Sequence, residues 1–146
     1  MLSVAGSGVY LRKMEKQMHR ILVVDDEPSI GEALAMGLAS QQFEVDVAID
    51  GKTGLQLGET GKYDVLIVDL YLPDMDGIDV IQKTRARYPG IVSIVITANS
   101  TRESQREALQ CGVSDYLEKP FALDSIKAAV RRAVTFRDSV RDGMNL

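Results

Sequence analysis

Residues 21–30 read ILVVDDEPSI, so four apolar residues run directly into three acidic ones. An uninterrupted apolar run rich in β-branched residues is typical of a strand that is covered on both faces. Adjacent carboxylates at the end of such a strand repel one another and offer no evident gain for folding. The stretch therefore predicts a buried strand that ends at a polar site. Pro28 is placed for the start of a following helix.

The same alternation of strand and helix continues along the chain. Five strand–helix pairs predict a doubly wound parallel sheet with helices on both faces. We expect a five-stranded, flavodoxin-like (βα)5 fold with strand order 2-1-3-4-5. The remaining strand-like runs are residues 43–48, 64–69, 91–96 and 113–118, and the helical segments are residues 28–40, 50–60, 76–90, 101–112 and 122–140.

Polar side chains stand at the ends of four of these strands. The first strand ends in Asp25 and Asp26 and the third in Asp69, while the fourth gives Thr97 and the fifth leads to Lys119. The carboxyl ends of parallel strands meet at one edge, where such sheets bind ligands. One aspartate there could simply cap the next helix. Five convergent polar residues instead indicate a site.

The residue types at this edge suggest a chemistry. Three neighbouring carboxylates either take up a proton or bind a hard cation. Mg²⁺ combines a few carboxylates with water and phosphate oxygens. A metal ion, an ammonium, a hydroxyl and a carboxylate nucleophile are together the components of phosphoryl transfer.

Composition narrows the classes of protein. The 146 residues suit one domain and carry a net charge of −4, with one cysteine and one histidine. These counts exclude an internal disulfide and a zinc site of the His- or Cys-rich kind. Residues 21–120 hold eight lysines and arginines against seventeen acidic residues, which disfavours direct nucleic-acid binding. No apolar run reaches membrane-spanning length, so we expect a cytoplasmic protein without membrane contact.

Four motifs make the chain resemble a known family. Over roughly residues 20–137 it is similar to the receiver domain of bacterial two-component response regulators. The resemblance implies that Asp69 accepts a phosphoryl group from a sensor histidine kinase or a histidine phosphotransfer protein. It implies a signalling domain that catalyses only its own phosphorylation and dephosphorylation. The motifs are VVDDEP (23–28), IVDLYLPDMDG (67–77), ITA (96–98) and DYLEKPF (115–121).

The resemblance also implies a set of metal ligands. Asp26 would bind Mg²⁺ or Mn²⁺ directly, and Asp25 would act through a water molecule. Asp69 and the backbone carbonyl of Tyr71 would complete the protein ligands. Glu27 is expected to cap the next helix or to face solvent instead.

Other residues are implied in handling the phosphoryl group and in passing on the signal. Lys119 would pair with the phosphoryl group, and the Lys119–Pro120 bond would be cis. Thr97 would form a hydrogen bond with the phosphoryl group. As Thr97 moves toward it, Tyr116 would turn inward and switch the neighbouring surface.

That surface is the face formed by the helix over residues 101–112, the strand over 113–118 and the helix over 122–140. The resemblance implies that a homodimer could form there. Tyr71 and Asn99 stand where receiver domains tune the lifetime of the phosphate. We expect bulky Tyr71 to slow its hydrolysis.

The domain boundaries follow from the same pattern. We expect residues 1–19 to be an extension that is disordered or derived from an expression vector. Residues 20–138 form the receiver domain, and residues 139–146 form a C-terminal tail. His19 falls outside the pattern and is expected to be exposed. The sequence leaves open whether the receiver stands alone or serves an output domain.

Two alternatives use the same fold differently. A Mg²⁺-dependent phosphohydrolase of the haloacid-dehalogenase type also uses a strand-end aspartate. It needs a second aspartate two residues later, where this chain has Tyr71. A flavin-binding module would need a phosphate loop rich in small residues after the first strand, but residues 25–29 read DDEPS.

Overall fold

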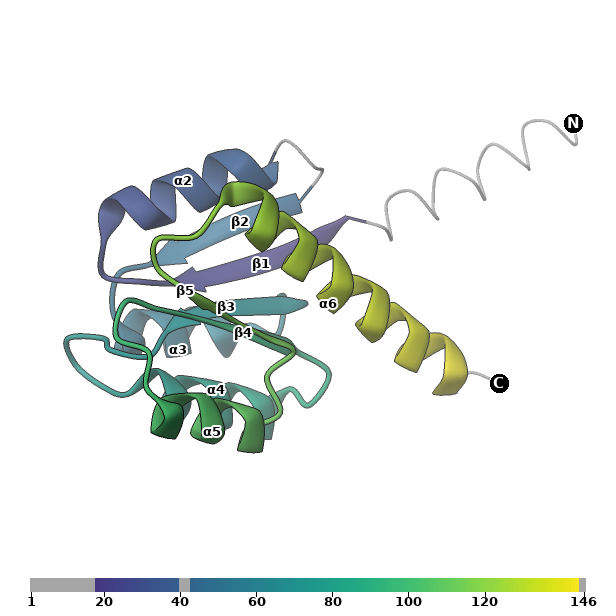
Figure 1. Cartoon of the computed structure of the whole chain (residues 1–146). Helices are drawn as coiled ribbons and strands as arrows, with labels where there is room; N and C mark the ends of the chain where they lie inside the picture. Colours follow the sequence, from purple (N-terminus) through teal and green to yellow (C-terminus); the bar gives the residue numbers. More distant parts are fainter. Residues whose placement is uncertain (1–17, 40–42, 145–146) are drawn as a thin grey trace, which may run out of the picture.

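The described part of the chain forms one sheet of five parallel strands, in the order β2-β1-β3-β4-β5 (Figure 1). The structure, a computed structural model, describes residues 18–39 and 43–144. The predicted parallel topology and strand order are confirmed. The strands are β1 (His19–Val24), β2 (Phe43–Ala48), β3 (Val65–Asp69), β4 (Val92–Thr97) and β5 (Asp115–Glu118).

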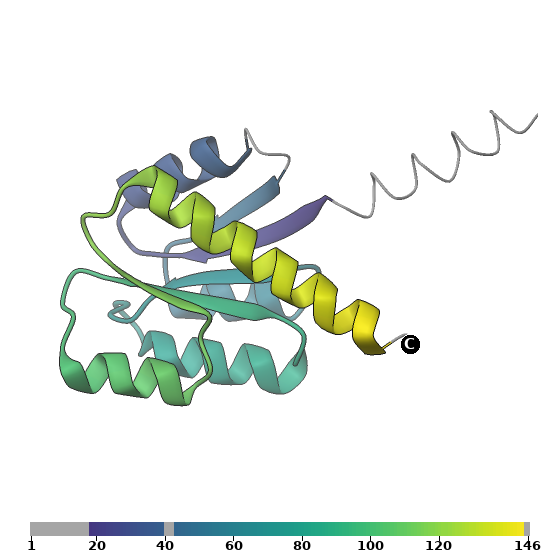
Figure 2. The same ribbon diagram turned by 45° about the vertical axis from the view of Figure 1, so that its right-hand side comes forward.

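Helices cover both faces of the sheet, as Figures 1 and 2 show from two directions. One face carries α2 (Pro28–Ala39) and α6 (Leu123–Met144). The other carries α3 (Gly51–Gly58), α4 (Gly77–Arg87) and α5 (Arg102–Gln110). The result is the three-layer arrangement that the alternating pattern predicts.

Successive residues of the central strands enter two different cores. Ile21 and Val23 pack with α2 and α6, whereas Leu22 and Val24 pack with the opposite helices. Side chains alternate between the faces of a sheet, so a strand covered on both sides must be apolar at every position. This explains why residues 21–24 form an unbroken apolar run.

Polar caps fix where the helices on one face begin. Asp50 accepts a hydrogen bond from Thr53 N at the start of α3, and Asp76 accepts one from Ile78 N at the start of α4. Thr101 begins α5 with a capping box. Such caps satisfy backbone donors that the first helical turn leaves unpaired.

Two expectations at the chain ends differ from the structure. His19 was expected to be exposed, but it opens β1, is 7% exposed and lies 3.2 Å from Asp138. Its ring also lies against that of Phe43. Pairing with a partner far along the chain lets this polar residue enter the sheet. The last helix continues to Met144, so residues 139–144 extend α6 and do not form a separate tail.

The predicted extension over residues 1–19 lies outside the described residues, apart from Met18 and His19. Within the described part of the chain, no helix combines the length and the apolar character that a membrane crossing demands.

Candidate functional site

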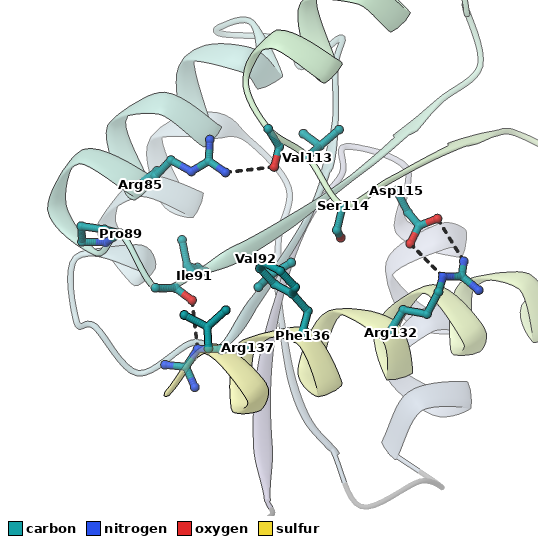
Figure 3. Close-up of a pocket in the computed structure, with 13 residues that line it drawn as sticks. Arg85, Pro89, Ile91, Val92, Val113, Ser114, Asp115, Arg132, Phe136 and Arg137 are labelled. Atoms are coloured by element: carbon teal, nitrogen blue, oxygen red, sulfur yellow. Dashed lines mark hydrogen bonds and ion pairs between the residues drawn. The ribbon is translucent and has the colours of Figure 1, made fainter. Parts of the chain in front are cut away.

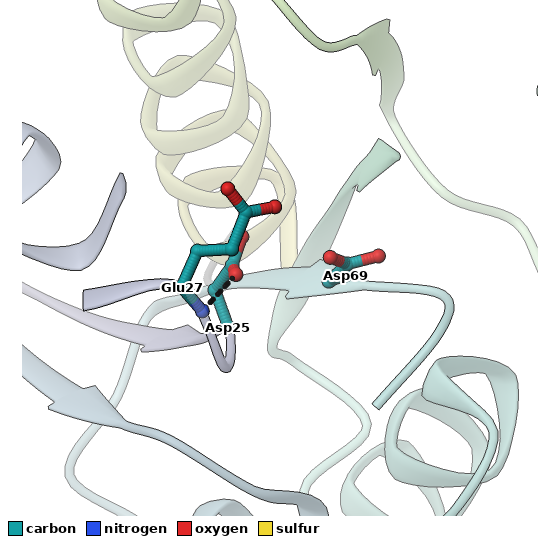
Figure 4. A group of neighbouring side chains, drawn as sticks. All are labelled: Asp25, Glu27 and Asp69. Carbon is teal, nitrogen blue, oxygen red and sulfur yellow. Dashed lines mark hydrogen bonds between the residues drawn. The ribbon is translucent and has the colours of Figure 1, made fainter. Parts of the chain in front are cut away.

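Carboxylates from two neighbouring strands meet at the carboxyl edge of the sheet. Asp25 follows β1 and Asp69 ends β3, and these strands are adjacent in the sheet. One oxygen each of Asp25, Glu27 and Asp69 lies within 4.8 Å of the others (Figure 4). Asp25 is 0% exposed and Asp69 is 5% exposed, so both carboxylates have lost most of their water. We call these three residues the acid group.

Among the residues that the structure describes, one ammonium lies between the three carboxylates. Lys119 Nζ is 2.8 Å from an oxygen of Asp25, 2.8 Å from one of Asp69 and 2.9 Å from one of Glu27. The Lys119 side chain is only 6% exposed. Burial lowers the pKa of Lys119, but the three carboxylates outweigh burial, and the pKa is raised overall. One positive charge therefore serves three negative charges.

Burial of Asp25 disfavours the charged form of its carboxyl group. Burial raises its pKa, although Lys119 and the amide of Glu27 oppose that shift. Asp25 Oδ1 accepts a hydrogen bond from Glu27 N at 2.9 Å. Asp25 Oδ2 lies beside Lys119 as an ion pair, yet this buried atom receives no well-directed hydrogen bond from the described residues.

These donors fit a hard divalent cation. All three residues offer oxygen ligands, which Mg²⁺ and Mn²⁺ prefer, and Asp25 Oδ2 retains free acceptor capacity. The membership of the acid group differs from the expected ligand set. Asp26 is exposed and is not part of the three-carboxylate group, whereas Glu27 joins it. The hydrogen bond from Glu27 N to Asp25 closes a turn, and this turn directs the Glu27 side chain toward Lys119. The spacing of apolar residues does not predict such a turn.

The loop after Asp69 carries the expected backbone ligand. The amide of Tyr71 donates to Asp69 Oδ1 at 3.0 Å, which ties the loop to the acid group. Tyr71 also forms an isolated antiparallel bridge with Asp76. The Tyr71 side chain is 51% exposed, so its ring lies at the surface beside the site.

The fourth and fifth strands bring the remaining predicted residues to the same edge. Thr97 ends β4, is fully buried and accepts a hydrogen bond from Asn99 N at 3.2 Å. The amide of Lys119 donates to Thr97 O at 2.8 Å, so β5 delivers the lysine next to β4. The Lys119–Pro120 bond is cis, as predicted.

Tyr116 connects β5 with the start of α5. Its hydroxyl donates to Ser100 Oγ at 3.0 Å and lies 2.9 Å from Ser104 Oγ. Ser104 is also part of the capping box with Thr101. A movement of Tyr116 would therefore disturb hydrogen bonds at the first turn of α5.

A separate cavity of about 680 Å³ lies at the opposite, amino-terminal edge of the sheet (Figure 3). Its lining includes Val92 at the start of β4 and Phe136 on α6. Arginines on its rim already have partners: Arg132 pairs with Asp115 at 3.0 Å, and Arg137 donates to Gly90 O at 3.0 Å. The cavity is thus distinct from the acid group, which is a compact charged cluster.

Comparison with known proteins identifies the family of this chain. The profile of the response regulator receiver domain matches residues 21–131. The transcriptional regulatory protein QseB of Haemophilus influenzae is 38% identical over 83% of this chain and 57% of its own length. The transcriptional regulatory protein CusR of Escherichia coli is 40% identical over 77% of this chain and 49% of its own length. The chain thus spans about half the length of these relatives.

Solved structures agree with the fold. A CheY-like receiver domain protein from Methanospirillum hungatei has a TM-score of 0.81 at 25% identity, covering 84% of this chain and 98% of that one. The beryllofluoride-activated NtrC4 receiver domain dimer has a TM-score of 0.78 at 29% identity, covering 82% and 99%. The phosphohydrolase alternative finds no support in these matches. The chain belongs to the response regulator receiver domain family, a family of signalling domains and not of metabolic enzymes.

Proposed function

We propose that this receiver domain accepts a phosphoryl group on Asp69. The donor would be the phosphohistidine of a sensor histidine kinase or of a histidine phosphotransfer protein. One observation carries the proposal: two buried carboxylates from adjacent strands share the single ammonium of Lys119. Structural ion pairs balance charge, whereas this arrangement retains an excess of negative charge that suits a cationic ligand.

Mg²⁺ or Mn²⁺ would be held by Asp25, Asp26, Asp69 and the carbonyl of Tyr71, with Glu27 close by. The ion would neutralise the carboxylates and the phosphoryl oxygens during transfer. This role is supported by the oxygen donor set of the acid group and by the free acceptor capacity of Asp25 Oδ2.

The chain's own residues would perform a simple displacement. A carboxylate oxygen of Asp69 attacks phosphorus, the phosphorus–nitrogen bond breaks, and its electron pair remains on the departing imidazole. The product is an acyl phosphate on Asp69. Lys119, already 2.8 Å from Asp69, moves its charge to the new phosphoryl oxygens. The domain would catalyse only this step and the later dephosphorylation, in which water attacks the acyl phosphate, inorganic phosphate leaves and the Asp69 carboxylate is restored.

The signal would leave through the face formed by α5, β5 and α6. The phosphoryl group brings about −1.5 to −2 charges, but the Asp69 carboxylate loses its own charge of −1 when the acyl phosphate forms, so the site gains about −0.5 to −1 charge together with new acceptor oxygens. Thr97 would turn its hydroxyl toward these oxygens, and Tyr116 would leave Ser100 and Ser104. The start of α5 would shift as a consequence, changing how this face binds a second copy or an output partner.

Two surface residues would set how long the phosphate lasts. Tyr71 and Asn99 both border the site, and the ring of Tyr71 is half exposed. A bulky ring beside the acyl phosphate would restrict the approach of water. We therefore expect Tyr71→Ala to shorten the lifetime of the phosphate a few-fold, measured as phosphate release after removal of the donor. An unchanged lifetime would reject this role for Tyr71.

Labelling with acetyl phosphate and Mg²⁺ tests the proposed function directly. Intact mass should show one added phosphoryl group on the wild type and none on Asp69→Ala. Removal of the metal with a chelator should also abolish labelling. The matched control is Asp64→Asn, which changes a carboxylate at the opposite edge of the sheet and should label normally. Labelling of Asp69→Ala, or labelling that survives chelation, would overturn the proposal.

A further inference from the structure

The loop between β3 and α4, residues 70–76, closes on itself together with Gly77, the first residue of α4. Gly77 N donates to Leu70 O at 2.8 Å, and Tyr71 bridges Asp76. The loop also passes close to the phosphoacceptor strand, since a Cβ placed on Gly77 would lie 2.2 Å from Asp69 O. This loop carries the Tyr71 carbonyl, so its position determines where that oxygen lies.

Asp74, at the tip of this loop, binds the start of a different helix. Its Oδ1 accepts a hydrogen bond from Gly51 N at 2.8 Å, and its Oδ2 accepts one from Lys52 N at 2.9 Å. These amides belong to the first turn of α3, where backbone donors lack partners within the helix. The carboxylate also suits the positive end of the helix dipole. The hydrogen bonds from Gly51 and then Lys52 lower the pKa of Asp74, so it is ionised at neutral pH.

A close apolar contact accompanies these hydrogen bonds. Met75 lies over Gly51, where an added Cβ would be 2.3 Å from Met75 Cγ. The loop is therefore held against α3 by two hydrogen bonds and a contact that leaves no room for a side chain on Gly51.

The start of α3 is in turn fixed to the other side of the acid group. Asp25 N donates to Ala48 O at 3.0 Å, just before α3 begins. A Cβ on Gly54 would lie 2.7 Å from Val24 Cγ2, so the first turns of α3 pack tightly on the end of β1. Asp74 thus links the Tyr71 loop to the same structure that positions Asp25.

We propose that Asp74 is a positioning residue for the metal and phosphoacceptor site, holding the Tyr71 carbonyl at the distance from Asp25 and Asp69 that a divalent ion requires. This inference rests on the proposed function of the acid group. Asp74 touches neither the ion nor the phosphoryl group. It acts through the loop, in the way that residues behind metal ligands fix their orientation.

Asp50 provides a matched control. It caps the same helix by accepting a hydrogen bond from Thr53 N at 2.7 Å, but it has no hydrogen bond to residues 70–77 among the interactions described for it. Asp50→Ala and Asp74→Ala each remove one carboxylate cap from α3. Both variants should unfold at lower urea concentrations than the wild type. Only Asp74→Ala releases the loop.

The experiment is a Mg²⁺ titration of the full chain, followed by backbone amide shifts of residues 69–72 without any phosphoryl donor. Asp74→Ala should raise the Mg²⁺ dissociation constant ~10-fold, as loss of a ligand-orienting residue does. Asp50→Ala should stay within about twofold of the wild type. Asp74→Asn retains an acceptor oxygen and should show an intermediate value, which also provides a folded variant if the alanine variant unfolds.

Equal effects of the Asp50 and Asp74 variants, or no change in either Asp74 variant, would overturn the positioning role. Failure of the proposed function can be distinguished from failure of the positioning role of Asp74. In that case the wild type itself would bind no Mg²⁺ at residues 69–72 or would take no phosphate from acetyl phosphate.

Discussion

The two edges of the sheet handle charge in opposite ways. At the amino-terminal edge, the ion pairs are spread over separate arginines: Arg137 pairs with Asp64, and Arg20 lies 3.1 Å from Glu44 and 3.8 Å from Asp46. At the carboxyl edge, three carboxylates share Lys119. The ion pairs at the first edge join neighbouring strands and attach α6 to the sheet. At the second edge, the excess negative charge of the three carboxylates opposes folding. A cationic ligand would relieve this repulsion.

Replacing the cationic side chain at each edge tests this contrast, and this test should give the largest effect. Lys119→Met should slow labelling by acetyl phosphate by about 10²–10³-fold, since it removes the group that stabilises the charge of the transferring phosphoryl group. Arg137→Met should lower stability toward urea but leave the labelling rate close to that of the wild type. Similar labelling rates for the two variants would end the distinction between the edges.

High pH should weaken the amino-terminal edge through Tyr63. Burial, and then the hydrogen bond that its hydroxyl donates to Asp46 at 2.6 Å, raise the pKa of Tyr63 to about 12. The folded state thus holds this proton more tightly than the unfolded chain does. The contribution is complete below pH 10, the ordinary tyrosine value, and is lost as pH rises toward 12.

The free energy of unfolding should fall by about 2–3 kcal/mol as this contribution is lost. Urea unfolding at several pH values should show the loss for the wild type and a weaker pH dependence for Tyr63→Phe. Tyrosinate absorbance should reveal one late-titrating tyrosine that this variant lacks. The same late titration in Tyr63→Phe would contradict the assignment.

Metal should stabilise the carboxyl edge selectively. At a free Mg²⁺ concentration ten times the dissociation constant, the free energy of unfolding should rise by about 1.4 kcal/mol. Asp25→Asn should lose most of this gain because it removes a buried carboxylate from the acid group. Asp64→Asn should retain it. A gain that is equal in both variants would locate the ion elsewhere.

A smaller effect should come from the hydroxyl of Tyr116. Tyr116→Phe removes the hydrogen bonds to Ser100 and Ser104. The unphosphorylated protein should lose about 1 kcal/mol of stability. If Tyr116 leaves these partners on activation, the beryllofluoride-treated protein should lose less, which urea unfolding of both forms would reveal. Equal losses would argue against movement of this side chain.

The sequence predicted those features that depend on local pattern. Unbroken apolar runs marked the central strands, and their common direction predicted that Asp25 and Asp69 would meet. The features that were missed depend on distant partners or on the geometry of a local turn, neither of which an apolar pattern reveals. Burial of His19 requires Asp138, which lies 119 residues away. The inclusion of Glu27 in the acid group depends on a turn, and the capping role of Asp74 depends on a helix that begins 23 residues earlier.

The length of α6 has a mechanical consequence. A rigid helix of its 22 residues measures about 33 Å, and Figure 1 shows it continuing past the end of the sheet. Arg137 pairs with Asp64, and Asp138 contacts His19. These two contacts attach α6 to the sheet partway along the helix. A tilt of about 5° over such a length displaces one end relative to the other by about 3 Å. Because Arg137 and Asp138 lie nearer to Met144 than to Leu123, a tilt about them moves the Leu123 end about twice as far as the Met144 end, so the attachment damps movement toward the end of α6.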